Sequence, residues 1–332
     1  MSKRFLAAAC AAATALALSA CSSAPSSEGN ASKDGTLTVM ASFYPLQYLA
    51  EKIGGEHVTV TSLTPAGAEP HDLELSPKTV DALASADAVV YLAGFQAAVD
   101  EAIEQQAPRT VIDVSPAADL VEANSSANHP SEDEDADEAQ SGESATEEHA
   151  DHDHEGHHHD MSTDPHFWLD PVRMASAATL VGDKLAEADP ANADTYKANA
   201  QALNEELSAL GDDLVAKTAT CQIKTFVTAH TAFGYLADRT GLTQVGISGL
   251  DPDSSPSPAR LAEIGQIAKE QGVTTIFTEA LIDPKVAQTL ADDLGISTAV
   301  LDPIESQTDS SKDYAAVMKD NINALATANN CQ

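Results

Sequence analysis

The chain has 332 residues, a length that fits two lobes of ordinary size better than one small domain. Its 17 Lys and Arg residues are outnumbered by 52 Asp and Glu residues, and the formal net charge of −35 excludes nucleic acid as a partner because phosphate would be repelled. Hydrophobic residues make up 43% and aromatic residues 4%, so we expect cores built mostly of Ala, Val, Leu and Ile.

The N-terminus has the pattern of an export signal. Lys3 and Arg4 precede the apolar stretch FLAAACAAATALALSA, which is short and Ala-rich for a membrane span. The following LSAC, ending at Cys21, resembles a bacterial lipobox. The resemblance implies a signal peptide over residues 1–20, a lipid on Cys21 and a flexible tether over residues 21–35. We therefore expect an extracytoplasmic lipoprotein anchored to the cell membrane.

Short β-rich runs alternate with helical patterns along the rest of the chain. The predicted strands lie at 36–42, 57–63, 87–93, 110–114, 223–229, 242–248, 274–279 and 297–301. Between them are helical patterns such as SPKTVDALASA, in which Ser76 is the expected N-cap and Pro77 opens the first turn. Alternating strands and helices predict an α/β fold with parallel sheets flanked by helices.

The two halves of the chain resemble each other at an offset of 187 residues. VMASFYPLQYLAEKIG (39–54) aligns with FVTAHTAFGYLADRTG (226–241), and DAVVYLA (87–93) aligns with TTIFTEA (274–280). A Ser-Pro pair opens a helix in each half. The common order and spacing of these matches predict two similar α/β lobes.

A long helical pattern separates the two halves. Its apolar residues recur at steps of four and three: Tyr196, Ala200, Leu203, Leu207, Leu210 and Leu214. Residues 190–217 therefore predict one helix, about 42 Å long at 1.5 Å per residue. We interpret it as a single helix packed against an N-terminal lobe (36–189) and a C-terminal lobe (218–332), rather than as an isolated coiled coil.

The four cysteines can be assigned once export is assumed. Cys10 is removed with the signal and Cys21 carries the lipid, which leaves Cys221 and Cys331. In an oxidising compartment we expect this remaining pair to form a disulfide.

An acidic, histidine-dense segment lies inside the N-terminal lobe. Residues 131–160 hold thirteen Asp and Glu and no Lys or Arg, a composition typical of a disordered loop, which we place at about 122–162. Six histidines crowd its second half: His149, His152, His154, His157, His158 and His159. We expect them to be auxiliary, low-affinity zinc ligands, because nothing in the composition imposes a single geometry.

Three other histidines share a more ordered context. His71 lies in TPAGAEPHDLELSP after the second predicted strand, His166 lies in STDPHFWLDP before a helix, and His230 follows the strand IKTFVTA. Ligands of open parallel sheets bind beyond the carboxyl ends of the strands, and Asp302 in AVLDPIES follows the last strand in the same way. Three neutral imidazoles and one carboxylate are a suitable ligand set for zinc. Two of these four residues lie in each half of the chain, so a metal bound by all four would join the lobes.

Several segments together resemble a known family. PHDLELSP, DPHFWLDP, AHTAFGYLAD, TEALIDPKVAQTLADDLG and the LDP near the end are similar to the zinc/manganese branch of ABC-transporter solute-binding proteins, in particular its ZnuA-type zinc-uptake members. The histidine-acid insertion is itself typical of the zinc members. The resemblance implies two α/β lobes joined by one rigid helix, with metal in the cleft between them.

Carried over position by position, the resemblance implies metal ligands at His71, His166, His230 and Asp302. In some zinc members a water or a nearby Glu fills the fourth place, so Glu69 is an alternative to Asp302, and Glu279 is a weaker one.

The implied function is the capture of Zn²⁺ outside the cytoplasm, by a monomer, and its delivery to a membrane-embedded ABC permease with a cytoplasmic ATPase. Mn²⁺ is less favoured, since imidazole suits zinc and the manganese members that resemble this chain place Glu where His230 stands. Two other classes stay open: an adhesin or zinc buffer of the same fold, and a zinc-dependent hydrolase. We do not expect an enzyme, because the chain has no GxSxG motif and no paired acid and base in a convincing context.

Overall fold

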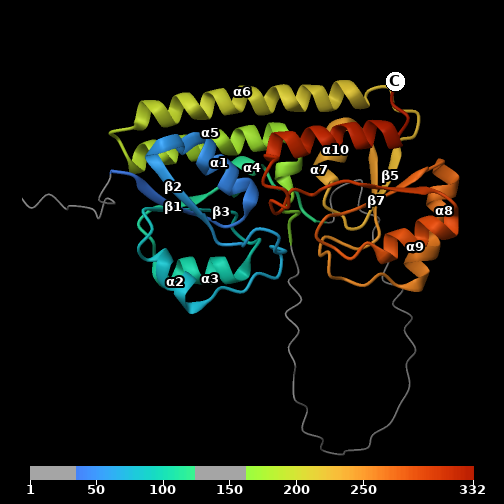
Figure 1. Ribbon diagram of the computed structural model, residues 1–332, viewed down its shortest axis with the longest axis horizontal. Coiled ribbons are helices and arrows are strands. Elements are labelled where there is room, and N and C mark those ends of the chain that lie inside the picture. Colours follow the sequence, from blue (N-terminus) through green and yellow to red (C-terminus); the bar gives the residue numbers. More distant parts are fainter. Residues whose placement is uncertain (1–34, 124–161) are drawn as a thin grey trace, which may run out of the picture. The chain divides into compact units, whose positions relative to one another are not determined.

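Two four-stranded parallel sheets, one from each half of the chain, form the framework of the fold (Figure 1). The computed structural model describes residues 35–123 and 162–332, which belong to one compact unit. The sheet orders are β2-β1-β3-β4 and β6-β5-β7-β8. The strands are β1 (Leu37–Ala41), β2 (Val58–Ser62), β3 (Ala88–Tyr91), β4 (Val111–Asp113), β5 (Thr225–Thr228), β6 (Thr243–Gly246), β7 (Thr275–Thr278) and β8 (Ser297–Val300). The α/β class and the two similar lobes are thus confirmed.

Helices cover both faces of the N-terminal sheet. They are α1 (Tyr44–Gly54), α2 (Pro77–Leu83), α3 (Ala97–Gln106), α4 (Ser115–Ala118) and α5 (Pro171–Ala188), with short 3-10 turns η1 (Gly55–His57) and η2 (Phe167–Leu169). Successive strand residues point to opposite faces. Accordingly, Met40 and Val89 pack in the cluster that includes α2 and α3, while Ala41 and Val90 pack in the cluster that includes α1 and α5.

The C-terminal sheet is layered in the same way by α7 (Gly234–Thr240), α8 (Pro258–Gln271), α9 (Lys285–Leu294) and α10 (Tyr314–Ala328). Val227 and Ile276 pack in the cluster with α8 and α9. Their neighbours Phe226 and Phe277 point to the other face, into the cluster that includes α7 and α10. Both sheets therefore have one face on a local core and one face on a larger core.

The larger core is shared by the two lobes. The long helix α6 (Ala193–Thr218) lies along α5 and also contacts α1, α7 and α10, so it touches helices of both lobes (Figure 1). All six apolar positions of its predicted stripe are buried. One continuous hydrophobic cluster contains residues from both sheets, which confirms the single linking helix and makes the lobes parts of one packed body.

Polar contacts also cross between the lobes. Asp170, which caps the start of α5 by accepting the Val172 N–H at 2.9 Å, is 2% exposed and accepts hydrogen bonds from the Arg239 guanidinium of α7. The Tyr235 hydroxyl donates to the carbonyl of Asp164 at 2.7 Å. These contacts attach the segment that precedes α5 to the C-terminal lobe.

Several predicted features fall outside the described residues. They are the signal peptide, the lipid-bearing Cys21, most of the tether and the six clustered histidines. An isolated antiparallel bridge joins Glu122 to Thr163, so the residues that flank the acidic insertion lie side by side. Among the helices of residues 35–123 and 162–332, none combines the length and the apolar character that crossing a membrane requires.

The predicted disulfide between Cys221 and Cys331 is present. It holds the C-terminal residues beside the chain that leads into β5, where the N–H groups of Gln222 and Ile223 donate to the carbonyls of Asn330 and Asn329 at 3.3 and 3.1 Å. The bond closes a chain segment with a sequence separation of 110.

Replacing both cysteines (Cys221→Ser with Cys331→Ser) should lower the free energy of unfolding by about 4 kcal/mol, because the unfolded chain regains the entropy of an open loop. Urea unfolding of the metal-free protein measures the change. Treatment with a reductant should destabilise the wild type and leave the double variant unaffected. Equal stability of the oxidised wild type and the double variant would contradict the prediction.

Candidate metal site

His71 is carried by the irregular loop between β2 and α2. The Gln96 amide Nε2 donates to the Pro70 carbonyl and to Thr64 Oγ1, both at 3.0 Å, and Gln96 is 2% exposed. The Glu69 carboxylate accepts the His71 N–H at 2.9 and 3.0 Å. These bonds fix the peptide that joins Pro70 to His71, and His71 itself is 9% exposed.

His166 lies just before the short turn η2, and its ring is oriented by a neighbouring carboxylate. Its Nδ1 is 2.8 Å from Asp164 Oδ1, and the same oxygen accepts the His166 N–H at 2.9 Å. An ionised carboxylate only accepts hydrogen bonds, so the proton of the neutral ring sits on Nδ1. The lone pair of Nε2 is therefore available, and it points into the protein, where His166 is fully buried.

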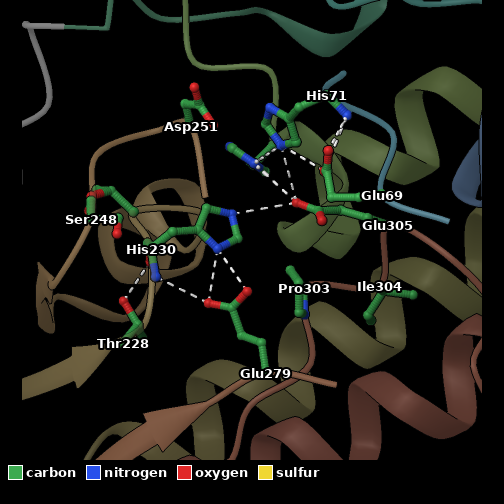
Figure 2. Close-up of polar contacts among 12 residues, drawn as sticks. Glu69, His71, Thr228, His230, Ser248, Asp251, Glu279, Pro303, Ile304 and Glu305 are labelled. Carbon is green, nitrogen blue, oxygen red and sulfur yellow. Dashed lines mark hydrogen bonds and ion pairs between the residues drawn. The ribbon is translucent and has the colours of Figure 1, made fainter. Parts of the chain in front are cut away.

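His230 follows β5 directly and has an equivalent partner. Its Nδ1 is 2.8 and 2.7 Å from the two carboxylate oxygens of Glu279, the residue after β7, and its N–H donates to Glu279 Oε1 at 3.0 Å (Figure 2). The carboxyl ends of neighbouring strands β5 and β7 thus place the imidazole and its partner together. As in His166, Nε2 is left to face the centre of the site.

Glu305 completes the group, from the segment that follows β8. Its Oε1 lies 3.4 Å from His71 Nε2, 3.3 Å from His166 Nε2 and 3.4 Å from His230 Nε2. Figure 2 shows its carboxylate between the rings of His71 and His230. Because the Glu305 side chain is only 2% exposed, this carboxylate is almost entirely withdrawn from water.

The spacing of these atoms matches a tetrahedral zinc site. A Zn²⁺ ion with ligands at 2.0–2.1 Å has tetrahedron edges of about 3.3–3.4 Å. The three distances to Glu305 Oε1 fall in that range, and so does the 3.3 Å between the Nε2 atoms of His166 and His71. These are four of the six edges of the tetrahedron, and all four atoms lie within 4.8 Å of one another.

The electrostatics of the group also suit a cation. Burial by itself raises the pKa of Glu305, but the contacts of its carboxylate with His166, His230 and His71 hold that pKa well below the ordinary value. Burial alone lowers the pKa of His230, yet the Glu279 and Glu305 carboxylates raise it well above 6.5. Asp164 and Glu305 raise the pKa of His166 against burial in the same sense. The group therefore favours an ionised carboxylate and positive charge on the rings beside it.

One buried nitrogen lacks a hydrogen bond within the protein. His230 Nε2 lies 3.4 Å from Glu305 Oε1 but makes no hydrogen bond, although its ring is held from the other side by Glu279. A buried polar atom without a hydrogen bond is costly, and a metal ion at the centre of the group would satisfy it. Among the described residues, these four form the one group of His, Cys, Asp and Glu side chains arranged to hold a metal.

The predicted acidic residues lie elsewhere, each with another contact. Asp302 is not in the group: its Oδ1 accepts the N–H of Ile304 at 2.8 Å, so the carboxylate closes a turn of its own backbone. Glu69 Oε1 lies 3.9 Å from His71 Nε2, outside the group, and Glu279 orients His230 from behind. The sequence pattern does not single out Glu305. It favours Asp302 because that acid is the nearer of the two to the end of β8, although LDPIES contains both.

Comparisons with known proteins identify the family of the chain. A family model described as "Zinc-uptake complex component A periplasmic" matches residues 39–328. The chain is 34% identical over 297 residues to the zinc-binding protein AdcA of Streptococcus pyogenes serotype M3, a match over 88% of this chain and 56% of AdcA, so the chain spans little more than half of that relative. It is 34% identical over 318 residues to the high-affinity zinc uptake system protein ZnuA of Bacillus subtilis (strain 168), over 93% of each.

A solved structure accounts for the partial match with AdcA. The Zn(II)-bound ZnuA-like domain of Streptococcus pneumoniae AdcA is 29% identical, with a TM-score of 0.69 over 89% of this chain and 99% of that domain. With the family match spanning both sheets and the linking helix, the chain belongs to the family of the periplasmic zinc-uptake complex component A.

Proposed function

We propose that this protein captures Zn²⁺ outside the cytoplasm and delivers it to the membrane permease of an ABC transporter. The observation that carries the proposal is the convergence of three imidazole Nε2 atoms on Glu305 Oε1 at 3.3–3.4 Å, the edge length of a tetrahedral zinc site. The family is that of a zinc-uptake component, and the names of AdcA and ZnuA describe zinc binding and zinc uptake.

We assign the four ligands to His71, His166, His230 and Glu305. Asp302 is not assigned as a ligand, because its carboxylate is engaged with Ile304, and Glu69 and Glu279 support the loops or rings instead. Asp164 and Glu279 bind the Nδ1 sides of two rings, the arrangement by which carboxylates orient zinc-bound histidines and raise their basicity.

The donor set favours zinc over manganese. Imidazole suits Zn²⁺, whereas Mn²⁺ prefers carboxylate and water in octahedral sites. Three of the four donors are nitrogens. All four side chains are 5% exposed or less, so the site has little access to the water that would complete the coordination of a six-coordinate ion.

The fourth ligand argues against a hydrolytic zinc site. A catalytic zinc keeps one coordination position open for water, while Glu305 Oε1 occupies the fourth corner here. The family likewise supplies a component of an uptake complex and not an enzyme.

The partners follow from the same proposal. The receiving protein is a membrane-embedded permease with a cytoplasmic ATPase. A relative of this chain from Streptococcus pneumoniae is named a zinc-binding lipoprotein, which supports a lipid on Cys21 as the anchor. We propose that the mature protein acts as a monomer, with the tether at 21–35, the N-terminal lobe at 36–189, the linking helix at 190–217 and the C-terminal lobe at 218–332.

The six clustered histidines (His149, His152, His154, His157, His158 and His159) are proposed as weaker, auxiliary zinc ligands. Their segment joins the described chain at the bridge between Glu122 and Thr163, and His166 follows Thr163 by three residues.

Removing any one ligand should abolish tight zinc binding. His71→Ala, His166→Ala, His230→Ala and Glu305→Gln should each weaken the affinity by more than the roughly 10–100-fold typical of losing a residue that only supports a ligand. Competition with a chelator of known affinity gives the measurement. The matched control is His57→Ala, since His57 lies in η1 beside Tyr196, away from the group, and should leave the affinity unchanged.

Deleting residues 131–160 separates the tight site from the auxiliary one. The deletion should reduce the number of zinc ions bound at high concentration and keep one tight site. Loss of the tight site in the deletion variant, with His71→Ala binding normally, would sink the ligand assignment.

Zinc affinity should fall steadily as the pH is lowered. Because the pKa values of His166 and His230 are raised, protons compete with zinc for these rings at a higher pH than they would for a free imidazole. The affinity should drop by about tenfold per pH unit for each proton displaced, and the loss should begin above pH 6.5. Calorimetry in buffers of different ionisation enthalpy counts the released protons; an affinity that is flat from pH 8 to pH 6 would contradict histidine ligation.

A further inference from the structure

The residue before Glu305 has an unusual backbone conformation. Ile304 has a φ of 57°, in the left-handed region, and is 1% exposed. A β-branched side chain is a genuine outlier there, and such a conformation persists only where the surroundings impose it. The other non-glycine residues with positive φ among those described are Ala, Asp and Asn, none of which is β-branched. The strain is therefore concentrated at the residue that sets the direction of Glu305.

Asp302 supplies the first constraint on this turn. Its Oδ1 accepts the Ile304 N–H at 2.8 Å. Its own backbone is fixed on both sides by Asn321 of α10, whose Oδ1 accepts the Asp302 N–H at 2.9 Å and whose Nδ2 donates to the Asp302 carbonyl at 2.6 Å. The backbone of Asp302 is therefore held in place, and with it the carboxylate that bonds Ile304.

Trp168 supplies the second constraint, from the other lobe. Its Nε1–H donates to the Pro303 carbonyl at 2.8 Å, and the ring is fully buried against Phe43 and Phe95. Trp168 follows the ligand His166 by two residues, and its own carbonyl accepts from the Tyr314 hydroxyl. The Glu305 segment is thereby joined to the His166 segment without any metal.

A third contact joins the Glu305 segment to the His71 loop. The Gly67 N–H donates to Ser306 Oγ at 2.7 Å, so the residues on both sides of Glu305 are attached to segments that carry other ligands. Figure 2 shows Pro303 and Ile304 below Glu305, whose carboxylate lies within the cluster.

We propose that Asp302 and Trp168 are positioning residues that hold Ile304 in its left-handed conformation and so present the Glu305 carboxylate to the three imidazoles. The proposal rests on the proposed zinc-binding function and deepens it. Without the Asp302 cap, Ile304 relaxes toward negative φ, the following peptide turns, and Glu305 Oε1 leaves its place 3.3–3.4 Å from the Nε2 atoms. The site is then left with three nitrogen ligands.

The pair Asp302→Ala and Asp302→Asn tests the hydrogen bond separately from the charge. Asparagine keeps an Oδ1 that can accept the Ile304 N–H, whereas alanine removes it. We expect Asp302→Ala to weaken Zn²⁺ affinity by roughly tenfold, the scale of one lost hydrogen bond. Asp302→Asn should bind within about twofold of the wild type, which lies inside the scatter of neutral substitutions. Equal losses in both variants would make the charge the active feature and overturn the proposal, as would no loss in either.

A double-mutant cycle with Glu305→Gln identifies the route of the effect. If Asp302 acts through Glu305, Asp302→Ala should cost nothing more once Glu305→Gln is present. Additive losses would show that Asp302 acts on the metal independently and would overturn the proposal. Co²⁺ in place of Zn²⁺ gives a second readout, because the strong visible absorption of tetrahedral Co²⁺ should weaken in Asp302→Ala and persist in Asp302→Asn.

Trp168→Phe provides the test should Asp302→Ala fail to fold. Phenylalanine keeps an aromatic ring against Phe43 and removes the N–H donor to Pro303, so affinity should again fall by roughly tenfold. Circular dichroism of the metal-free variants establishes that each is folded. Wild-type affinity in folded Trp168→Phe would overturn the proposal, whereas a wild-type protein that binds no zinc would overturn the proposed function itself.

Discussion

The arrangement depends on one contact: a buried carboxylate oxygen placed 3.3–3.4 Å from three imidazole nitrogens. At this spacing the carboxylate can form hydrogen bonds only with rings that carry a proton on Nε2, and when the rings are neutral its charge is buried without compensation. The protein alone leaves His230 Nε2 without a hydrogen bond. A dication at the centre resolves both problems at once, because it accepts four lone pairs and neutralises the carboxylate. The loops, strand ends and strained turn serve to keep these four atoms in place.

The two sheets supply the convergence. The loop after β2 carries His71, the end of β5 carries His230, and the segment after β8 carries Glu305, so three of the four ligands follow carboxyl ends of parallel strands. The shared hydrophobic core, with α6 packed on helices of both lobes, keeps those ends facing each other without help from the metal. A tetrahedral site tolerates errors of only a few tenths of an ångström, and a continuous core can hold that tolerance where two independently moving lobes could not.

The sequence predicts the framework well because its signals are local. The eight strands, the linking helix and its buried stripe follow from periodicity and from capping residues such as Ser76 and Ser257, whose side chains accept the N–H groups of the first turn. Three histidines could be chosen from eleven because each stands at a strand end or a turn, away from the acidic run. The disulfide pairing follows from compartment and elimination. Each of these inferences needs only neighbouring residues or a count.

The fourth ligand could not be predicted in this way. Asp302 and Glu305 are three residues apart in LDPIES, and chemistry alone does not separate them. The choice depends on the left-handed conformation of Ile304, which we attribute to Asp302 and Trp168. Asp302 is itself held by Asn321 of α10, and Trp168 bonds Pro303, which lies 135 positions further along the chain. No periodicity reports such contacts. The orienting partners of the rings were equally hidden: Glu279 is 49 residues from His230 and meets it only because β5 pairs with β7.

The charges of the site bear on how a metal can enter and leave so buried a place. Without metal, the contacts in the group hold the pKa of Glu305 well below its ordinary value and raise the pKa values of His166 and His230. The group thus favours positive charge beside a buried carboxylate, whether protons or a metal ion supply it. Burying a bare dication among neutral groups would carry a large desolvation penalty, and a site that already favours positive charge reduces it. The carboxylates behind the rings therefore do two things: they orient the imidazoles, and they favour positive charge at the centre of the site.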